Sequence, residues 1–171
     1  MGLVHLYTGD GEGKSITAFG LALRAVGHGY KVIIVQFMKG RRNVGEYKVW
    51  KRLAPNYEIH QFGRKEFVNL KKPSRIDYIL ANRALRFAKK ALKRKPRLLI
   101  LDEINLAASL GLVKLEDVLD LLRNIPKPTT VVLTGRNAPK ELVKQADLVT
   151  EMREIKHPLK KGVQARRGIE Y

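Results

Sequence analysis

The most informative segment of the chain is Thr8-Gly9-Asp10-Gly11-Glu12-Gly13-Lys14-Ser15. It matches the phosphate-binding pattern G-x-x-x-x-G-K-[ST] at every fixed position except the first, where Thr8 stands in place of glycine. Three alternating glycines allow backbone N–H groups to turn inward around an anion, at the positive end of a following helix. Lys14 adds a mobile positive charge, and the Ser15 hydroxyl is a ligand for Mg²⁺. The segment therefore predicts a phosphate-binding loop rather than a merely structural turn.

Apolar runs around this loop predict alternating strands and helices. The expected strands are residues 3–7, 32–35, 98–101, 130–133 and 148–149, and the expected helices are residues 14–26, 75–95 and 115–123. Continuous β-branched runs are typical of strands that are buried on both faces of a parallel sheet. We therefore expect one α/β domain over residues 1–171, with a mostly parallel sheet and helices on both faces, of the RecA-like phosphate-loop NTPase class.

Two acidic residues, Asp102 and Glu103, follow directly after the expected strand at residues 98–101. In open α/β sheets, ligands bind beyond the carboxyl ends of the strands. A carboxylate there can reach a metal ion on bound phosphates, so Ser15, Asp102 and Glu103 are the candidate Mg²⁺ ligands. The alternative is a helix cap, because acidic residues favour helix N-termini. The phosphate loop favours the metal role.

A phosphate-loop hydrolase or kinase also needs a group that positions water or an acceptor hydroxyl. Gln36, Glu103 and Thr134 are the candidates, and nothing in the residue pattern chooses among them. The residues taken alone therefore predict a protein that binds a nucleoside triphosphate with Mg²⁺, and they leave the reaction open.

Composition narrows the class of protein. The chain has 171 residues and no cysteine, which excludes disulfides, cysteine-ligated metals and thiol catalysis and is typical of a reducing compartment. No apolar run approaches the roughly 18 residues that a membrane span requires. We therefore expect a cytoplasmic protein without a membrane segment.

The net charge of +18 is concentrated in one region, because residues 39–97 contain 19 basic and 4 acidic residues and contribute +15 of it. Such a region indicates an anionic partner, or else the solvated surface of a heat-adapted protein. Two alternative functions follow from it. One is a nucleic-acid-stimulated ATPase, and the other is an ATP-sensing module that docks an acidic protein. Since no nucleic-acid-reading motif accompanies the charge, we do not expect nucleic acid as the partner.

Several further segments, taken with the phosphate loop, resemble one family. They are ALRAVGHG (22–29), VQFMKG (35–40), LDEIN (101–105), LTGRNAP (133–139), ADLVTEM (146–152) and GVQARRGIEY (162–171). Together they resemble the ATP:corrinoid adenosyltransferases of the phosphate-loop type. The resemblance spans nearly the whole chain and is weakest between residues 48 and 97.

The resemblance implies transfer of the 5′-deoxyadenosyl group of ATP to the Co(I) of a reduced corrinoid such as cob(I)alamin, with release of triphosphate. It implies Lys14 and Glu103 as catalytic residues, and Ser15, Glu103 and Asp102 as residues that hold Mg²⁺. The ATP-binding residues would be Thr8, Gly9, Asp10, Gly11, Glu12, Gly13, Lys14, Ser15, Ile16 and Arg136. It also implies a homodimer and a flavoprotein that delivers electrons.

The chain departs from the family pattern in several places, among them Ser15-Ile16 where paired threonines are usual, and two departures bear most on ligand binding. Asp10 and Glu12 bring two carboxylates into the loop, and we expect them to weaken polyphosphate binding unless they face solvent or contact the ribose or the metal. Family members have an aromatic segment that helps to displace the lower cobalt ligand. Its counterpart here is residues 61–68, where the sequence differs from the family pattern, and Phe62 or Phe67 is expected to take this role. Arg166 is a further expected corrinoid contact, with surface solvation as its alternative.

Overall fold

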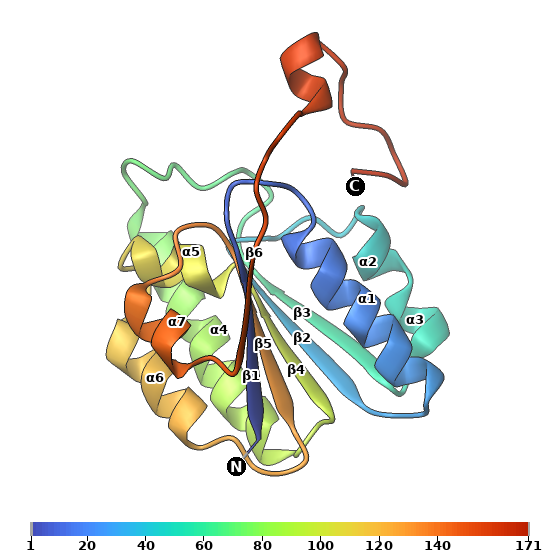
Figure 1. Cartoon of the computed structure of the whole chain (residues 1–171), viewed down its shortest axis with the longest axis vertical. Helices are drawn as coiled ribbons and strands as arrows, with labels where there is room; N and C mark the ends of the chain where they lie inside the picture. The colour runs from blue at the N-terminus through green and yellow to red at the C-terminus, as the bar shows by residue number, and fades with distance from the viewer. Residues whose placement is uncertain (1, 171) are drawn as a thin grey trace.

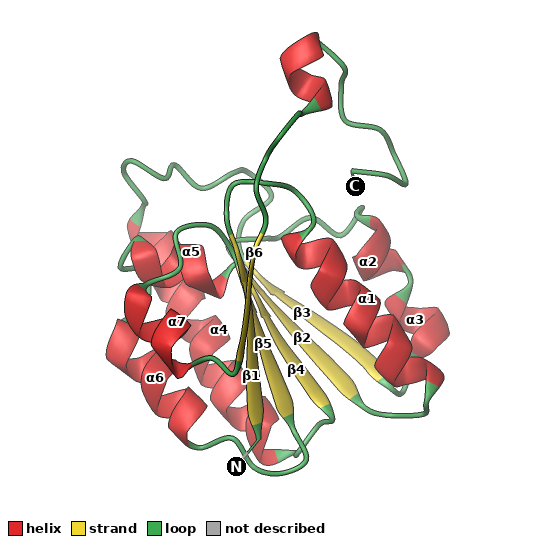
Figure 2. Ribbon diagram, in the orientation of Figure 1, coloured by secondary structure: helices red, strands yellow, loops and turns green. Residues whose placement is uncertain are grey.

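The computed structural model describes residues 2–170 and has three layers, with a central sheet between two groups of helices (Figures 1 and 2). The strands are β1 (Leu3–Thr8), β2 (Val32–Phe37), β3 (Tyr57–Phe62), β4 (Leu98–Asp102), β5 (Thr130–Thr134) and β6 (Leu148–Glu151). All neighbouring pairs are parallel, and the order across the sheet is β3-β2-β4-β5-β1-β6. The expected parallel α/β architecture is confirmed.

Helices cover both faces of the sheet (Figure 2). One face carries α1 (Lys14–Gly27), α2 (Gly45–Lys48) and α3 (Trp50–Leu53), and the other carries α4 (Arg75–Lys93), α5 (Ile104–Ser109), α6 (Leu115–Arg123) and α7 (Lys140–Gln145). Each face has its own hydrophobic core: Ile34 packs in the core beneath α1, whereas Val35 packs in the core beneath α4. Successive strand side chains point to opposite faces, which explains why β2 is apolar without interruption.

The apolar runs predict five of the six strands and the three longest helices. Helix α6 has the predicted bounds, while α1 ends one residue later and α4 two residues earlier than predicted. Strand β3 and the short helices α2, α3, α5 and α7 are absent from the prediction. Strand β3 lies at the edge of the sheet, and its polar residues interrupt the apolar pattern on which the prediction relied.

The carboxyl ends of the strands all lie at one edge of the sheet, next to the loop that joins β1 to α1 (Figure 1). Beyond β6 the chain continues as a C-terminal arm, residues 153–170, which contains the 3₁₀ helix η1 (Pro158–Lys161). Figure 1 shows this arm rising beyond the same edge of the sheet. Within residues 2–170, no helix combines the length and the apolar character that a bilayer crossing requires.

Glu58 joins β3 to the end of α4 and gives the fold an acid-sensitive contact. Its carboxylate accepts a bidentate pair of hydrogen bonds from Arg94 and lies 3.1 Å from Lys31 Nζ. The hydrogen bonds from Arg94, together with Lys31, lower the pKa of Glu58 to about 2. The stabilisation is therefore complete above the ordinary glutamate pKa, and it is lost as the pH falls toward about 2.

Glu58→Gln is accordingly expected to lose part of the acid sensitivity of the wild type. Urea denaturation at pH 6 and at pH 2.5 measures it: the difference in unfolding free energy between the two pH values is expected to be smaller in Glu58→Gln than in the wild type. Glu66→Gln, at an exposed loop position, serves as the control and is expected to behave as the wild type. An unchanged acid sensitivity in Glu58→Gln would show that the contact contributes nothing.

Candidate active site

The phosphate loop leads into the N-terminus of α1, where its last glycine allows a sharp turn. Gly13 is the N-cap of α1 and has a φ of 109°, a conformation that glycine adopts without strain. No side chain caps this end of the helix, and its first turn contains no acidic residue. The free N–H groups and the helix dipole therefore remain available for an anion from outside the chain.

Lys14 lies beside these N–H groups and is only 8% exposed. Its Nζ donates a hydrogen bond to the Gly11 carbonyl at 2.5 Å. Burial lowers the pKa of Lys14, and the positive charge of Arg136 lowers it further, while Glu103, Asp10 and Glu12 act in the opposite direction. A partly desolvated ammonium that faces a second cation is stabilised when a polyanion binds between them.

Asp102 is fully buried at the end of β4 and is surrounded by four hydrogen-bond donors. Ser15 Oγ and Thr134 Oγ1 donate to its Oδ1 at 2.6 and 2.8 Å. Gln36 Nε2 and Lys39 Nζ donate to its Oδ2 at 3.0 and 2.7 Å. Burial alone would raise the pKa of Asp102, but Lys39 and the hydroxyl donors hold it below its usual value. The carboxylate is therefore ionised and fixed in position.

These contacts bear on the predicted role of Asp102 as a metal ligand, which stays a prediction. A carboxylate has about four lone-pair directions, and the four donors occupy all of them. Asp102 orients Ser15, whose hydroxyl donates a hydrogen bond to the carboxylate and so keeps its lone pairs available for a cation. Ser15 fits the expected metal role, while Asp102 acts behind it.

Glu103 has the carboxylate of the acidic pair that accepts no hydrogen bond from the described residues, although Lys39 lies 4.0 Å from it. Its φ of 65° directs the residue away from the strand, and Thr134 Oγ1 accepts its N–H at 3.0 Å. Burial raises the pKa of Glu103, as does the neighbouring Asp102, while Lys39, Lys14 and Arg136 lower it. A partly desolvated carboxylate of this kind gains from a nearby divalent ion. With Ser15 it supplies the oxygen ligands that suit Mg²⁺ bound to phosphates. The Thr134 hydroxyl is engaged by both acidic residues, because it accepts the Glu103 N–H and donates to Asp102 Oδ1.

Lys39 is a site residue that the sequence reasoning missed. The positive φ of Met38, 58°, turns the chain after β2 and brings Lys39 over the end of β4. Its Nζ lies 2.7 Å from Asp102 Oδ2 and 4.0 Å from Glu103 Oε1. Burial alone would lower the pKa of Lys39, but the two carboxylates raise it above the usual value. Its place in the segment VQFMKG was the one signal available.

Met152, the residue after β6, packs directly against the phosphate loop. Its N–H donates to the Thr8 carbonyl at 2.8 Å, and its carbonyl accepts the Gly11 N–H at 2.7 Å. A Cβ on Gly9 would lie 2.3 Å from the Met152 carbonyl oxygen, and one on Gly11 would lie 2.8 Å from it. The first two glycines therefore permit the close approach of the Met152 backbone, as well as the turn.

Gly9→Ala is expected to destabilise the protein by about 1–3 kcal/mol and to weaken ATP binding, because Gly9 has a φ of 95° and the added methyl group overlaps Met152. Gly20→Ala is the matched control. Gly20 lies within α1 with nothing within 4 Å of its Cβ position, so alanine there is expected to stabilise the protein by about 0.5–1 kcal/mol. Urea denaturation checks both values. Stabilisation by Gly9→Ala would contradict the packing described here.

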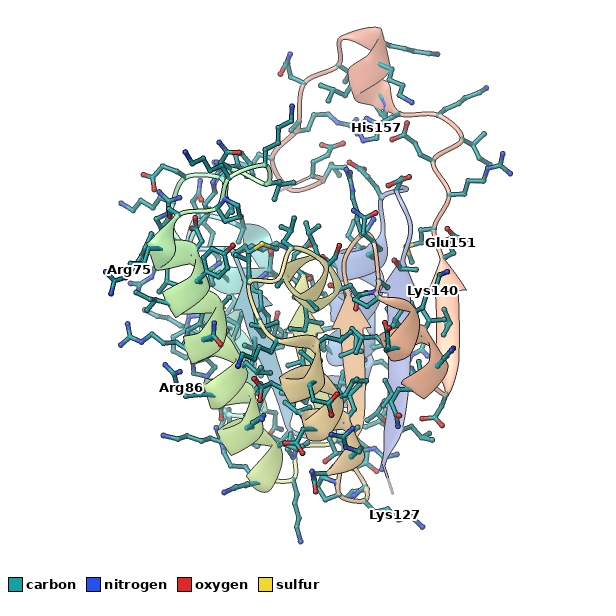
Figure 3. The ribbon with its side chains drawn as sticks, turned by 90° about the vertical axis from the view of Figure 1, so that its left-hand side faces the viewer. Arg75, Arg86, Lys127, Lys140, Glu151 and His157 are labelled. Carbon is teal, nitrogen blue, oxygen red and sulfur yellow. The ribbon has the colours of Figure 1, made fainter. Side chains whose placement is uncertain are left out.

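The C-terminal arm is attached to the phosphate loop through Glu12. His157 Nε2 lies 2.7 Å from Glu12 Oε1, and His157 Nδ1 accepts the Leu159 N–H at 3.1 Å (Figure 3). The acceptor role of Nδ1 makes Nε2 the donor to Glu12. Asp10 and Glu12 are both exposed. Because the two extra carboxylates of the loop face solvent, we do not expect them to weaken polyphosphate binding.

Two open cavities lie between the phosphate loop and the C-terminal arm. One has a volume of about 730 Å³, and its lining includes Asp10 and Lys160. The other has a volume of about 590 Å³, and its lining includes Gly11 and Pro158. Both therefore provide space for a ligand next to the loop.

The predicted corrinoid residues lie in different surroundings. Phe62, at the end of β3, packs on Phe87 of α4 with ring centroids 5.5 Å apart. Phe67 is 82% exposed, and the Arg41 guanidinium lies 4.0 Å from its ring centroid. Arg166 is in the arm and pairs with Glu170 at 2.9 Å. The structure thus favours Phe67 over Phe62 as an aromatic surface for a ligand.

Two further ATP-binding candidates lie at the edges of the site. Ile16 is 63% exposed on the first turn of α1. Arg136 is exposed in the loop after β5, close enough to influence the pKa values of Lys14 and Glu103. The residues brought together at the centre are Lys14, Ser15, Lys39, Asp102 and Glu103, with Arg136 beside them.

Comparison with known proteins gives a consistent result. A family model described as ATP:corrinoid adenosyltransferase BtuR/CobO/CobP matches residues 1–171. A corrinoid adenosyltransferase of Pseudomonas aeruginosa is 36% identical over 171 residues, covering 99% of this chain and 84% of that protein. Those of Escherichia coli K12 and Salmonella typhimurium are each 33% identical, covering 99% of this chain and 86% of the relative.

Among solved structures, the flagellar accessory protein FlaH from Methanocaldococcus jannaschii is similar to this chain with a TM-score of 0.57. The two are 15% identical, and the match covers 87% of this chain and 70% of FlaH. At this level of identity the likeness concerns the fold alone.

Proposed function

The chain belongs to the ATP:corrinoid adenosyltransferase family, and on this basis we propose that the phosphate loop holds the triphosphate of ATP while a reduced corrinoid attacks the ribose. The enzyme transfers the adenosyl group of ATP to the cobalt of a corrinoid. The electron pair of Co(I) forms the cobalt–carbon bond, the bond between C5′ and its oxygen breaks, and triphosphate leaves with the bonding electrons. The protein therefore needs to position the reactants and to stabilise the departing charge, without a nucleophile of its own.

The observation that carries the proposal is the uncapped N-terminus of α1 beside the buried ammonium of Lys14. The positive charge of Arg136 contributes to the lowered pKa of Lys14, and a polyanion bound between the two side chains would offset their repulsion. Residues 8–16 and Arg136 form the ATP site, with Lys14 and Glu103 as the catalytic residues. The Gly11 N–H does not face the phosphates, because it donates to Met152.

Mg²⁺ fits this site through Ser15 and Glu103. The Ser15 hydroxyl keeps its lone pairs available because it donates its hydrogen bond to Asp102, and the raised pKa of Glu103 reflects a carboxylate that gains from a nearby cation. When bound, Mg²⁺ would draw negative charge from the triphosphate. Lys39 balances the charge of Asp102 beside this site, so the buried carboxylate does not repel the triphosphate.

The remaining expectations extend the proposal to partners. A homodimer is supported by the exposed apolar side chains of the C-terminal arm, among them Ile155 at 84% and Ile169 at 64% exposure. An electron-donating flavoprotein with an acidic surface suits the outer face of α4, where Arg75 and Arg86 point into solvent (Figure 3). The absence of cysteine from the sequence supports a cytoplasmic location. Residues 1–171 act as one domain in this proposal.

The corrinoid lies against Phe67 in this proposal, with Arg166 as a further contact. Phe67 is the exposed aromatic residue of the loop that follows β3. The alternative of a nucleic-acid-stimulated ATPase is not favoured, because the family match spans residues 1–171.

The experiment that tests the proposal is anaerobic incubation of the protein with Mg²⁺, ATP and chemically reduced cobalamin. The absorption spectrum of an alkyl-cobalt product is expected, together with one equivalent of intact tripolyphosphate. Formation of ADP and orthophosphate without an alkyl-cobalt product would show that phosphorus, not carbon, is attacked. Added DNA or RNA is expected to leave the rate unchanged.

A further inference from the structure

Three polar side chains form a row across neighbouring strands at the edge of the sheet that holds the site. Strand register places Gln36 of β2 opposite Gln61 of β3 on one side and opposite Asp102 of β4 on the other. Gln36 and Asp102 are both fully buried. Burial of polar side chains such as these costs free energy unless every polar group is paired, so their presence among apolar strands calls for a reason.

The direction of the hydrogen bonds along the row is fixed. Asp102 is ionised and accepts only, so Gln36 presents its Nε2 to Asp102 at 3.0 Å and its Oε1 to the other side. Gln61 Nε2 donates to that Oε1 at 2.9 Å and to the Arg41 carbonyl at 2.9 Å. A flipped Gln61 amide would bring its oxygen against two acceptors, so the orientation has no alternative.

Gln61 leaves one polar atom without a partner. Its Oε1 is buried and accepts no hydrogen bond from the described residues. Native proteins leave few such groups, and each one calls for an explanation. The Gln61 amide is therefore held where it makes two donor contacts at the expense of its own acceptor.

The row continues from Gln61 to the loop that carries the exposed aromatic residue. Gln61 holds the backbone of Arg41. The Arg41 Nε donates to the Lys65 carbonyl at 2.9 Å, and its guanidinium lies 4.0 Å from the centroid of the Phe67 ring. Arg64 Nε fastens the same loop to Asp77 of α4 at 3.1 Å. The position of Phe67 therefore depends on Arg41.

At its other end the row reaches the phosphate loop through Asp102. Asp102 Oδ1 accepts the Ser15 hydroxyl, while Oδ2 accepts Gln36. A ligand that binds Ser15 changes the charge distribution on the Asp102 carboxylate. This alters the hydrogen bond that Gln36 donates to the same carboxylate, because hydrogen bonds in a chain polarise one another. One continuous set of contacts thus joins Ser15 to Phe67.

We propose that Gln36 and Gln61 are positioning residues that couple the two substrate sites, so that ATP at the phosphate loop and the corrinoid at Phe67 strengthen each other's binding. This inference rests on the proposed function, which places the two substrates at these ends of the row. Coupling is reciprocal: the factor by which ATP raises corrinoid affinity equals the factor by which the corrinoid raises ATP affinity. A merely structural row would stabilise the fold without such a factor.

Titration calorimetry with hydroxocobalamin measures the coupling, because its Co(III) cannot attack ATP and both ligands remain intact. In the wild type, saturating Mg²⁺ and ATP are expected to tighten hydroxocobalamin binding about tenfold. In Gln61→Met, which keeps the length of the side chain and removes its hydrogen bonds, the factor is expected to fall below about threefold. The affinity of Gln61→Met for each ligand measured alone is expected to change less than about twofold, which is small beside a typical coupling factor.

A second variant and a control separate this result from general damage. Arg41→Ala changes an exposed side chain, so it is expected to fold and to lose the coupling in the same way. Gln145→Met makes the same exchange as Gln61→Met at a half-buried position on α7 and is expected to retain the wild-type factor. Reduced coupling in both test variants, with Gln145→Met unchanged, supports the proposal.

The contrary outcomes are distinct. Wild-type coupling in Arg41→Ala and Gln61→Met would overturn the role of the row. A wild type that binds both ligands without coupling would do the same, and the proposed function would still stand if adenosylcobalamin and tripolyphosphate form in the anaerobic assay. Failure of that assay in the wild type would instead overturn the proposed function, and this inference with it.

Discussion

Lys14→Ala is expected to lower kcat/KM for adenosyl transfer by about 100- to 1,000-fold, the loss typical of removing one group that stabilises charge in a transition state. The ammonium of Lys14 lies at the start of α1, only 8% exposed, next to the N–H groups that face the triphosphate. Without it the leaving group departs with less of its charge compensated. The anaerobic spectrum of the alkyl-cobalt product measures the rate.

Lys140→Ala is the control for this variant, because Lys140 lies exposed on the surface of α7 (Figure 3). Its rate is expected to match that of the wild type. Circular dichroism is expected to show a folded protein in both variants, since among residues 2–170 the Lys14 ammonium donates only to the Gly11 carbonyl. Retention of more than a tenth of the wild-type rate by Lys14→Ala would remove the main support for the proposed role of the phosphate loop.

Asp102→Asn is expected to lower the free energy of unfolding by about 3 kcal/mol, near the low end for removal of one partner from a buried ion pair, because the Lys39 side chain is 33% exposed. Four donors converge on the carboxylate, and an asparagine amide would present its own N–H groups to some of them. Lys39 would lose its buried counter-charge. Urea denaturation at pH 7 measures the change.

The choice of pH follows from the lowered pKa of Asp102. Its stabilising contribution is present at neutral pH and is lost only as the pH falls below the ordinary carboxyl range. Asp120→Asn is the control, since the side chain of Asp120 is 52% exposed and pairs with Lys89 at 3.3 Å. It is expected to change stability by less than about 1 kcal/mol. Equal effects of the two substitutions would contradict the structural role of Asp102.

Much of the fold was predictable because its strands carry a strong signal. The run at residues 32–35 is apolar without interruption, which both faces of a covered parallel sheet require. The same rule brings the end of β4 to the phosphate loop, so the proximity of Ser15 and Asp102 follows from the sequence. Edge strand β3 could not be predicted in this way, because polar residues interrupt its apolar pattern.

The roles within the site were less predictable, because they depend on contacts between distant elements. Asp102 and Glu103 are equivalent in the sequence, yet four donors saturate Asp102 and leave Glu103 free. Lys39 reaches the pair only because Met38 adopts a positive φ. His157 is 145 residues from Glu12, and no pattern in the sequence pairs the two side chains.

The contact between Met152 and the phosphate loop has a consequence for biosynthesis. The ribosome makes strand β1 and its loop before β5 and β6, which are the neighbours of β1 in the sheet. The loop acquires its backbone support only once Met152 has emerged from the exit tunnel. A nascent chain therefore contains its phosphate-binding motif before the backbone contacts that support the motif can form.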